Sequence, residues 1–324
     1  MVKCVQDIVS AIQGLPMNML FRGQVNDEWK VQPTLLRNEM SPKWSVYESA
    51  IFDAWLKYRD KIPYPRSNDA FDYLATLQHF GAPTRLLDIT SDIYTAIFFA
   101  CYDPENKYAD KDGVVYIINK NCFHEEQLVQ SKMDSHSRID SIHERLNFSD
   151  IRLIVPFEKN PRLRAQQGQF LCFPLGSISG YEGHYATLNE YSVFVTNELK
   201  SYGQKNHPEK NWESYNAYCL LAIKIDKAYK NSILQELSYK YGVTEQSLFT
   251  PTPAIIPYEP IYKYIHWWAM KHADLITPLI EKYANNEISI NEKLDVIYSE
   301  YLKLKSASKE KFEFNIPVII QDNL

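Results

Sequence analysis

The sequence is poor in glycine and cysteine, and this scarcity excludes several kinds of site. Only 10 glycines occur in 324 residues, and none of them forms a glycine-rich phosphate loop. The five cysteines, Cys4, Cys101, Cys122, Cys172 and Cys219, never stand in CxxC spacing. We therefore expect neither a disulfide framework nor a metal site such as zinc, and the scattered thiols favour a reducing cytoplasm.

Long apolar runs and an excess of basic residues are also missing. No stretch approaches about 18 uninterrupted apolar residues, so no membrane span is expected. The first residues, with the acidic Asp7 among them, do not read as a signal peptide. Lys and Arg number 35 against 40 Asp and Glu, and the net charge of −5 argues against a broad surface for duplex nucleic acid.

Hydrophobic and aromatic residues are what the chain has in quantity. Hydrophobic residues make up 45% of the sequence and aromatic residues 14%, including 23 tyrosines. This composition supplies a sizeable core. The tyrosines either fill that core and its surface or stack against a planar ligand.

Hydrophobic periodicity predicts an α+β fold. Helices are predicted over 5–12, 44–58, 71–80, 233–241 and after a cap at Ser91 or Asp92, and strands over 20–24, 85–89, 114–118, 169–173 and 218–225. Because strands and helices do not alternate strictly, we expect a mixed central sheet of short strands flanked by helices.

Composition changes divide the chain into a domain and an extension. Residues 1–250 are predicted to form one domain, with its core over 20–250. Within it, the polar stretch 120–152 is predicted to be an irregular insertion, and 176–213, rich in Gly, Ser, Tyr and Asn, a loop or lid. Prolines after position 250 mark a break, and 251–324 is predicted to be a mainly helical C-terminal extension packed on the domain.

Four blocks of sequence, in order, carry a family resemblance. They are Phe21-Arg-Gly-Gln24 with 32–37, then 78–90 with 94–100, then 160–170, and last 223–249. The chain resembles the FRG-domain family, named for the Phe-Arg-Gly signature. That family's layout is similar to the ADP-ribosyltransferases, which implies NAD as a substrate and a protein or RNA as the macromolecular acceptor. The resemblance also implies a bacterial toxin or phage-defence effector, with an antitoxin or chaperone as a further partner.

The resemblance assigns roles to particular residues. The catalytic candidates are Arg22, His79, Thr90, Gln167 and Glu182, and the NAD-binding candidates are Arg22, Gly23, Gln24, Thr84, Arg85, Ser91, Tyr94 and Gln166. An arginine grips a pyrophosphate in fork geometry, and a neighbouring glycine lets the backbone approach the ligand. A carboxylate favours the positive charge that builds on the ribose. We expect these blocks to converge on one cleft.

The sequence departs from the transferase pattern at the carboxylate. Where a Glu is wanted, Gln166, Gln167 and Gln169 stand, and an amide bonds a hydroxyl without supplying negative charge. Glu182 and Glu190 are the nearby carboxylates in the predicted lid. Three functions stay open: an NAD-dependent transferase, a non-catalytic nucleotide-binding module, and a hydrolase of RNA or a nucleotide that uses His79 and a carboxylate.

Each candidate also has a structural interpretation. Arg22 can cap carbonyls at a strand end, His79 can bond a backbone carbonyl, and Tyr94 can pack in the core. Arg85 and Asp88 lie on opposite faces of the predicted strand, so each needs another partner.

Overall fold

The computed structural model describes residues 2–13, 15, 18–37, 47–48, 50, 69–79, 81–126, 151–156, 161–174, 192–194 and 220–249. Most of the helix predicted over 44–58 therefore lies outside the described residues, and so does the whole extension at 251–324. The helices are α1 (Val5–Ile12), η1 (Thr34–Arg37), α3 (Ala70–His79), α4 (Ile93–Cys101), η3 (Lys120–Cys122), α6 (Pro161–Ala165), η5 (Lys227–Tyr229), α9 (Lys230–Tyr241) and α10 (Glu245–Leu248).

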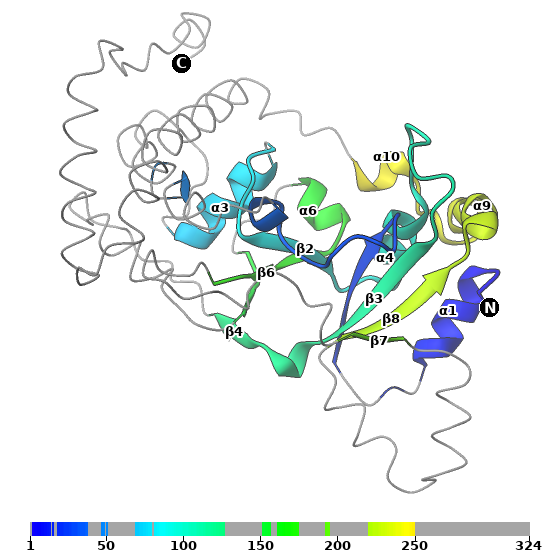
Figure 1. Cartoon of the computed structure of the whole chain (residues 1–324), viewed down its shortest axis with the longest axis horizontal. Coiled ribbons are helices and arrows are strands. Elements are labelled where there is room, and N and C mark those ends of the chain that lie inside the picture. Colours follow the sequence, from blue (N-terminus) through cyan, green and yellow to red (C-terminus); the bar gives the residue numbers. More distant parts are fainter. Residues whose placement is uncertain are drawn as a thin grey trace, which may run out of the picture.

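The strands form one sheet. They are β1 (Met19–Gln24), β2 (Leu86–Thr90), β3 (Gly113–Asn119), β4 (His124–Glu126), β5 (Arg152–Ile154), β6 (Gly168–Cys172), β7 (Ser192–Phe194) and β8 (Leu220–Ile225), in the spatial order β4-β5-β6-β2-β1-β3-β8-β7. The pairs β4–β5 and β7–β8 at the two edges are parallel, and the other pairs are antiparallel. The predicted α+β class with a mixed sheet is confirmed (Figure 1).

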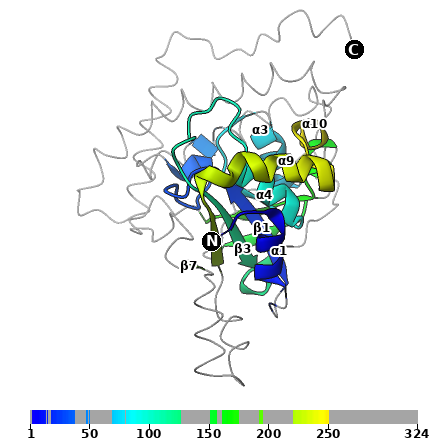
Figure 2. The ribbon, with the colours of Figure 1, turned by 90° about the vertical axis from the view of Figure 1, so that its right-hand side faces the viewer.

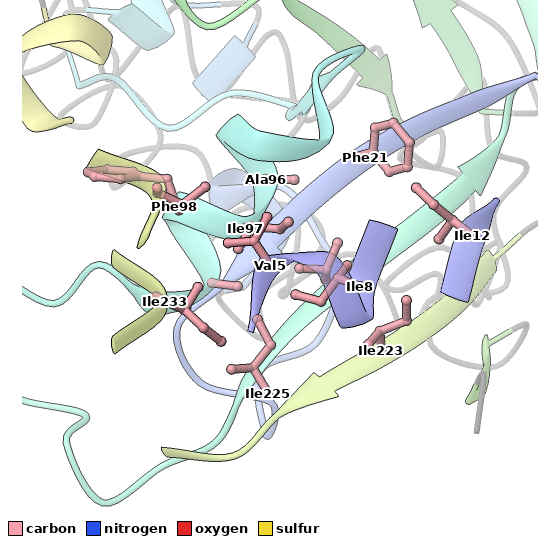
Figure 3. Packing of buried hydrophobic residues seen from close by; sticks show 14 of the residues in the cluster. Val5, Ile8, Ile12, Phe21, Ala96, Ile97, Phe98, Ile223, Ile225 and Ile233 are labelled. Atoms are coloured by element: carbon pink, nitrogen blue, oxygen red, sulfur yellow. The ribbon is translucent and has the colours of Figure 1, made fainter. Parts of the chain in front are cut away.

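The central strands β3 and β8 are buried on both faces, which explains their nearly continuous apolar sequence. Side chains alternate between two hydrophobic clusters: Val115 and Ile117 join one, and Val114 and Tyr116 join the other. The first cluster is completed by α1, α4 and α9, which lie on the same side of the sheet (Figures 2 and 3).

Helix α4 packs unusually close to β1 and β3, because both strands carry a glycine under it. A Cβ atom built on Gly23 would lie 1.9 Å from the carbonyl oxygen of Ala96, and one built on Gly113 would lie 2.1 Å from that of Ala100. Backbone atoms cannot move aside as a flexible side chain can. Gly23 therefore serves the packing of α4, and its approach to a ligand stays a prediction.

Capping side chains define the helix ends. The Asp92 carboxylate accepts hydrogen bonds from the backbone N–H groups of Tyr94 and Thr95, so Asp92 rather than Ser91 caps α4. Gly242, at φ 66°, ends α9 in the left-handed conformation that glycine adopts readily. No described helix is both long and apolar enough to cross a membrane.

The prediction of an irregular insertion over 120–152 is wrong at both ends. β4 forms at one end and β5 at the other, and they pair with each other at the edge of the sheet. Their three-residue length is too short for a period-2 hydrophobic pattern, and charged pairs hold the edge instead. Arg152 Nη1 lies 3.2 Å from Glu126 Oε2, and Lys120 Nζ lies 2.7 Å from Glu125 Oε2. β7 likewise falls within the predicted lid at 176–213, whose other residues lie outside the described part.

Candidate functional site

The border between β1 and β2 is where backbone pairing stops. Their register contains the single pair Phe21↔Thr90, whereas β1 pairs with β3 at six positions and β2 pairs with β6 at five. Beyond that pair, the Arg22 side chain takes over: its Nη1 donates a hydrogen bond of 2.7 Å to the backbone oxygen of Asp88 on β2. A side chain therefore bridges the two strands where backbone amides would otherwise meet.

A cavity of about 290 Å³ lies at this opening. It is lined by residues from six elements and the turn after α6: Phe21, Arg22 and Gly23 of β1; Ala75, Gln78 and His79 of α3; Asp88, Ile89 and Thr90 of β2; Thr95 and Phe99 of α4; Arg162, Leu163 and Gln166 of α6 and the turn after it; and Gly168 and Phe170 of β6. Its volume is at the lower end of ligand sites and suits a ligand about the size of one nucleotide.

Two arginines and one aspartate set the charge of the described lining. Burial lowers the pKa of Arg22 and of Arg162, and in each case the Asp88 carboxylate opposes that shift. The Nε atom of Arg22 is shielded from solvent, and no described group accepts a hydrogen bond from it. A shielded guanidinium donor without an acceptor is costly, and an anionic ligand would supply the missing oxygen.

His79 ends α3 at the cavity, where it is half-buried. Its pKa is lowered, first by burial and then by the positive charge of Arg162. The imidazole is therefore neutral at pH 7 and can accept a proton.

Thr90 and Gln166 hold the cavity wall in place. Thr90 Oγ1 donates to the backbone oxygen of Gln166 at 2.7 Å and accepts from the N–H of Asp92 at 2.9 Å. Gln166 Nε2 in turn donates to the backbone oxygen of Leu248 at 3.1 Å. Both side chains line the cavity, yet these polar atoms are engaged by the protein itself.

Three predicted ligand contacts lie in the interior instead of the cavity lining. Gln24 is buried and its Nε2 donates to the backbone oxygen of Lys30 at 3.4 Å. The Thr84 hydroxyl donates to Gln78 Oε1. Arg85 forms a buried ion pair with Glu48, with Nε 2.6 Å from Oε1, which is the separate partner that its place on the strand required.

Three further candidates lie beside the cavity without lining it. The Ser91 hydroxyl donates to Gln167 Oε1 at 3.3 Å, and Gln167 itself sits in a turn with φ 45°. Tyr94 stacks on Tyr241 with ring centroids 4.4 Å apart. Glu182 and Glu190 lie outside the described residues.

The structure adds Asp88, Arg162, Gln78 and Phe99 to the residues selected from the sequence. Asp88 was interpreted as structural, and Arg162 stood in the third block without a role of its own. Residues Pro161–Ala165 form α6, which is too short to show a helical period in the sequence, and this helix brings Arg162 to the cavity. No group of three or more His, Cys, Asp or Glu side chains within the described ranges is arranged to hold a metal ion.

Comparison with known proteins gives one match. Residues 17–109 match the family model of the FRG domain. Neither the curated proteins nor the solved structures contain a match to the chain. The matched segment supplies β1, α3, β2 and α4 to the cavity, whereas α6 and β6 come from beyond it. This chain contains an FRG domain, and the Phe-Arg-Gly signature of that domain stands on β1 at the wall of the cavity.

Proposed function

We propose that the cavity binds the phosphate-bearing part of a nucleotide, and that this nucleotide is NAD, whose ADP-ribose group the protein transfers to a macromolecule. The observation that carries the proposal is that Arg22, Arg162 and Asp88 line one cavity, where the shielded Nε of Arg22 has no acceptor among the described residues. Two guanidinium groups suit a pyrophosphate, whose oxygens accept paired N–H donors.

The chemistry assigns a further role to Asp88. When the bond between ribose C1′ and the nicotinamide nitrogen breaks, its electron pair leaves with the nicotinamide, and positive charge builds on the ribose. A carboxylate in the cavity stabilises that charge, and Asp88 takes the place that the transferase pattern gives to a Glu. The acceptor then forms a bond to C1′ and loses a proton, which neutral His79 receives. With water as the acceptor, the same steps hydrolyse NAD.

A nucleotide-binding module without catalysis is the second candidate. Thr90 Oγ1 and Gln166 Nε2 already form hydrogen bonds within the protein. These two predicted site residues therefore hold the cavity wall instead of acting on a substrate, which favours binding without catalysis. The acceptor, a protein or an RNA, and a role as toxin or defence effector belong to the first candidate.

The test measures binding and chemistry separately. NAD is titrated into the protein by calorimetry, and free nicotinamide and labelled ADP-ribose on macromolecules are followed in a cell lysate. Arg22→Ala should weaken NAD binding roughly 10- to 150-fold, which corresponds to about 1.5–3 kcal/mol for a charge-assisted contact. Asp88→Asn should slow nicotinamide release about 100-fold or more while binding is largely kept.

Lys107→Ala is the matched control, because this lysine pairs with Glu105 on the surface and does not line the cavity. Binding of NAD without release by the wild-type protein would replace the transferase by the binding module. If NAD neither binds nor is cleaved, or if Asp88→Asn releases nicotinamide at the wild-type rate, the proposed chemistry is wrong.

A further inference from the structure

The wall of the cavity that carries Arg162 is held from outside by α10 and the residue after it. The guanidinium carbon of Arg162 lies 4.7 Å from the centroid of the Phe249 ring. A cation–π contact attracts the guanidinium through the ring face and uses no hydrogen-bond acceptor, so the N–H groups remain available to an anion. The ring therefore orients Arg162 without occupying its donors.

Phe249 is itself fixed in place. Its N–H donates to the backbone oxygen of Glu245 at 2.8 Å, and Leu248 before it is buried in the core. The ring also meets Phe99 of α4 and Tyr102, the residue that follows α4, with 5.8 Å between ring centroids in each case. Because Phe99 lines the cavity too, Phe249 spans two of the walls.

A second contact ties the same wall to α10. Gln166, which follows α6, lines the cavity, and its Nε2 donates to the backbone oxygen of Leu248. Two neighbouring residues, Leu248 and Phe249, thus hold two side chains of the wall. Leu248 lies 82 positions further along the chain than Gln166, and both residues lie beyond the segment that matches the family.

We infer that Phe249 is a positioning residue for anion binding through Arg162, and that docking of α10 and occupancy of the cavity stabilise each other. The inference deepens the proposed function and rests on its anion site, although it does not require that the anion be NAD. Coupling of this kind is reciprocal: if docked α10 favours the ligand, the ligand must favour docked α10 by the same factor.

A double-mutant cycle with inorganic pyrophosphate tests the first half. Phe249→Leu keeps an apolar side chain against α4 and removes the ring face, so the affinity for pyrophosphate should fall roughly 5- to 30-fold, the range of a partly buried cation–π contact. Phe249→Tyr should bind as the wild type does. In an Arg162→Gln background, Phe249→Leu should have no further effect, because the ring then has no cation to orient.

Tyr239→Leu is the matched control, since this tyrosine on α9 is 91% exposed and its loss should leave affinity unchanged. Equal losses from Phe249→Leu with and without Arg162 would show that Phe249 acts only on the fold, and would overturn the inference. Absence of pyrophosphate binding by the wild-type protein would overturn it as well. Pyrophosphate binding with the expected cycle, but no response to NAD, would retain the inference and reject the proposed function.

Hydrogen exchange tests the second half. The N–H groups of Leu248 and Phe249, bonded to Thr244 and Glu245, should exchange more slowly when pyrophosphate saturates the cavity. The Arg162→Gln variant, at a pyrophosphate concentration that fills its own cavity, should lose most of this protection. Unchanged exchange in the wild-type protein at saturation would mean that α10 and the cavity are independent, and the coupling would be rejected.

Discussion

Strand β1 pairs with two neighbouring strands, and the extent of backbone pairing differs between them. Toward β3 it forms a continuous register of six pairs, covered by α4 at a distance that only glycine permits. Toward β2 it forms one pair and then relies on the Arg22 side chain. The β3 border is closely packed, whereas the β2 border contains a cavity and an arginine donor for which no described group is an acceptor.

Arg85 and Arg22 differ in the same way: one is fully paired within the fold and the other is not. Arg85 is buried and paired with Glu48, so its charge is neutralised within the fold. Arg22 bonds a backbone oxygen and leaves its Nε without a described partner. A buried charge that is paired indicates a structural role, whereas a half-buried arginine with a shielded donor beside a cavity is a candidate for ligand binding.

The largest expected effect comes from breaking the paired arginine. Arg85→Met leaves the Glu48 carboxylate buried without its cation and should lower the free energy of unfolding by about 3–5 kcal/mol. The double variant Arg85→Met/Glu48→Leu should recover much of that loss, and Arg22→Ala should cost only about 1 kcal/mol. Urea denaturation measures all three. An Arg22→Ala loss as large as that of Arg85→Met would remove the distinction between the two arginines.

The next effect tests the β3 border. Gly23→Ala places a Cβ against the carbonyl of Ala96 and should destabilise the protein by about 3 kcal/mol, because a backbone atom rather than a side chain must move. Gly81→Ala is the control: its φ is +87° and nothing lies near its missing Cβ, so it should cost about 1 kcal/mol. Equal denaturation midpoints for the two variants would show that α4 shifts easily.

The smallest effect is a pH dependence at the β2 border. Burial and Arg162 lower the pKa of His79 in the free protein, and a bound anion would raise it again. Affinity for ADP-ribose should therefore increase as the pH falls from 8. It should level off below the pKa that His79 has in the free protein. A gain of about three- to tenfold corresponds to a rise of roughly half to one pKa unit.

This dependence is measured by calorimetry in buffers of different ionisation enthalpy, which report proton uptake directly. The diphosphate of ADP-ribose does not titrate in this range, so the proton is taken up by the protein. His79→Gln should bind with a flat pH profile. If the variant retains the wild-type slope, another group is responsible.

Much of the fold followed from sequence periodicity, and its failures have a common cause. The prediction of α1 was confirmed at the same residues, 5–12, because four apolar side chains recur at helical spacing in that segment. α6, β4 and β5 have three to five residues each, too few to display a period, and only the pairing of distant segments reveals them.

The site was harder to predict than the fold for a related reason. Sequence blocks can indicate which residues matter, but not whether a side chain faces a cavity or a partner in the interior. Thr84 and Arg85 stand in the same block as Asp88 and Thr90, yet Asp88 and Thr90 line the cavity and the other two do not. The Glu48 that pairs with Arg85 is 37 residues away, with no local signal to connect them.

The close approach of α4 to Gly23 has a consequence for how homologous chains should be sorted. In the Phe-Arg-Gly signature, Phe21 is buried in the core and Gly23 accommodates the helix, so these two letters report the architecture. Arg22 bonds the backbone of β2 through Nη1, and its Nε has no described acceptor. We expect a chain that keeps the aromatic residue and the glycine but replaces the arginine to keep the fold and to lose the proposed anion binding. Under the proposed function, the middle residue of the tripeptide distinguishes FRG domains that bind an anion from those that do not.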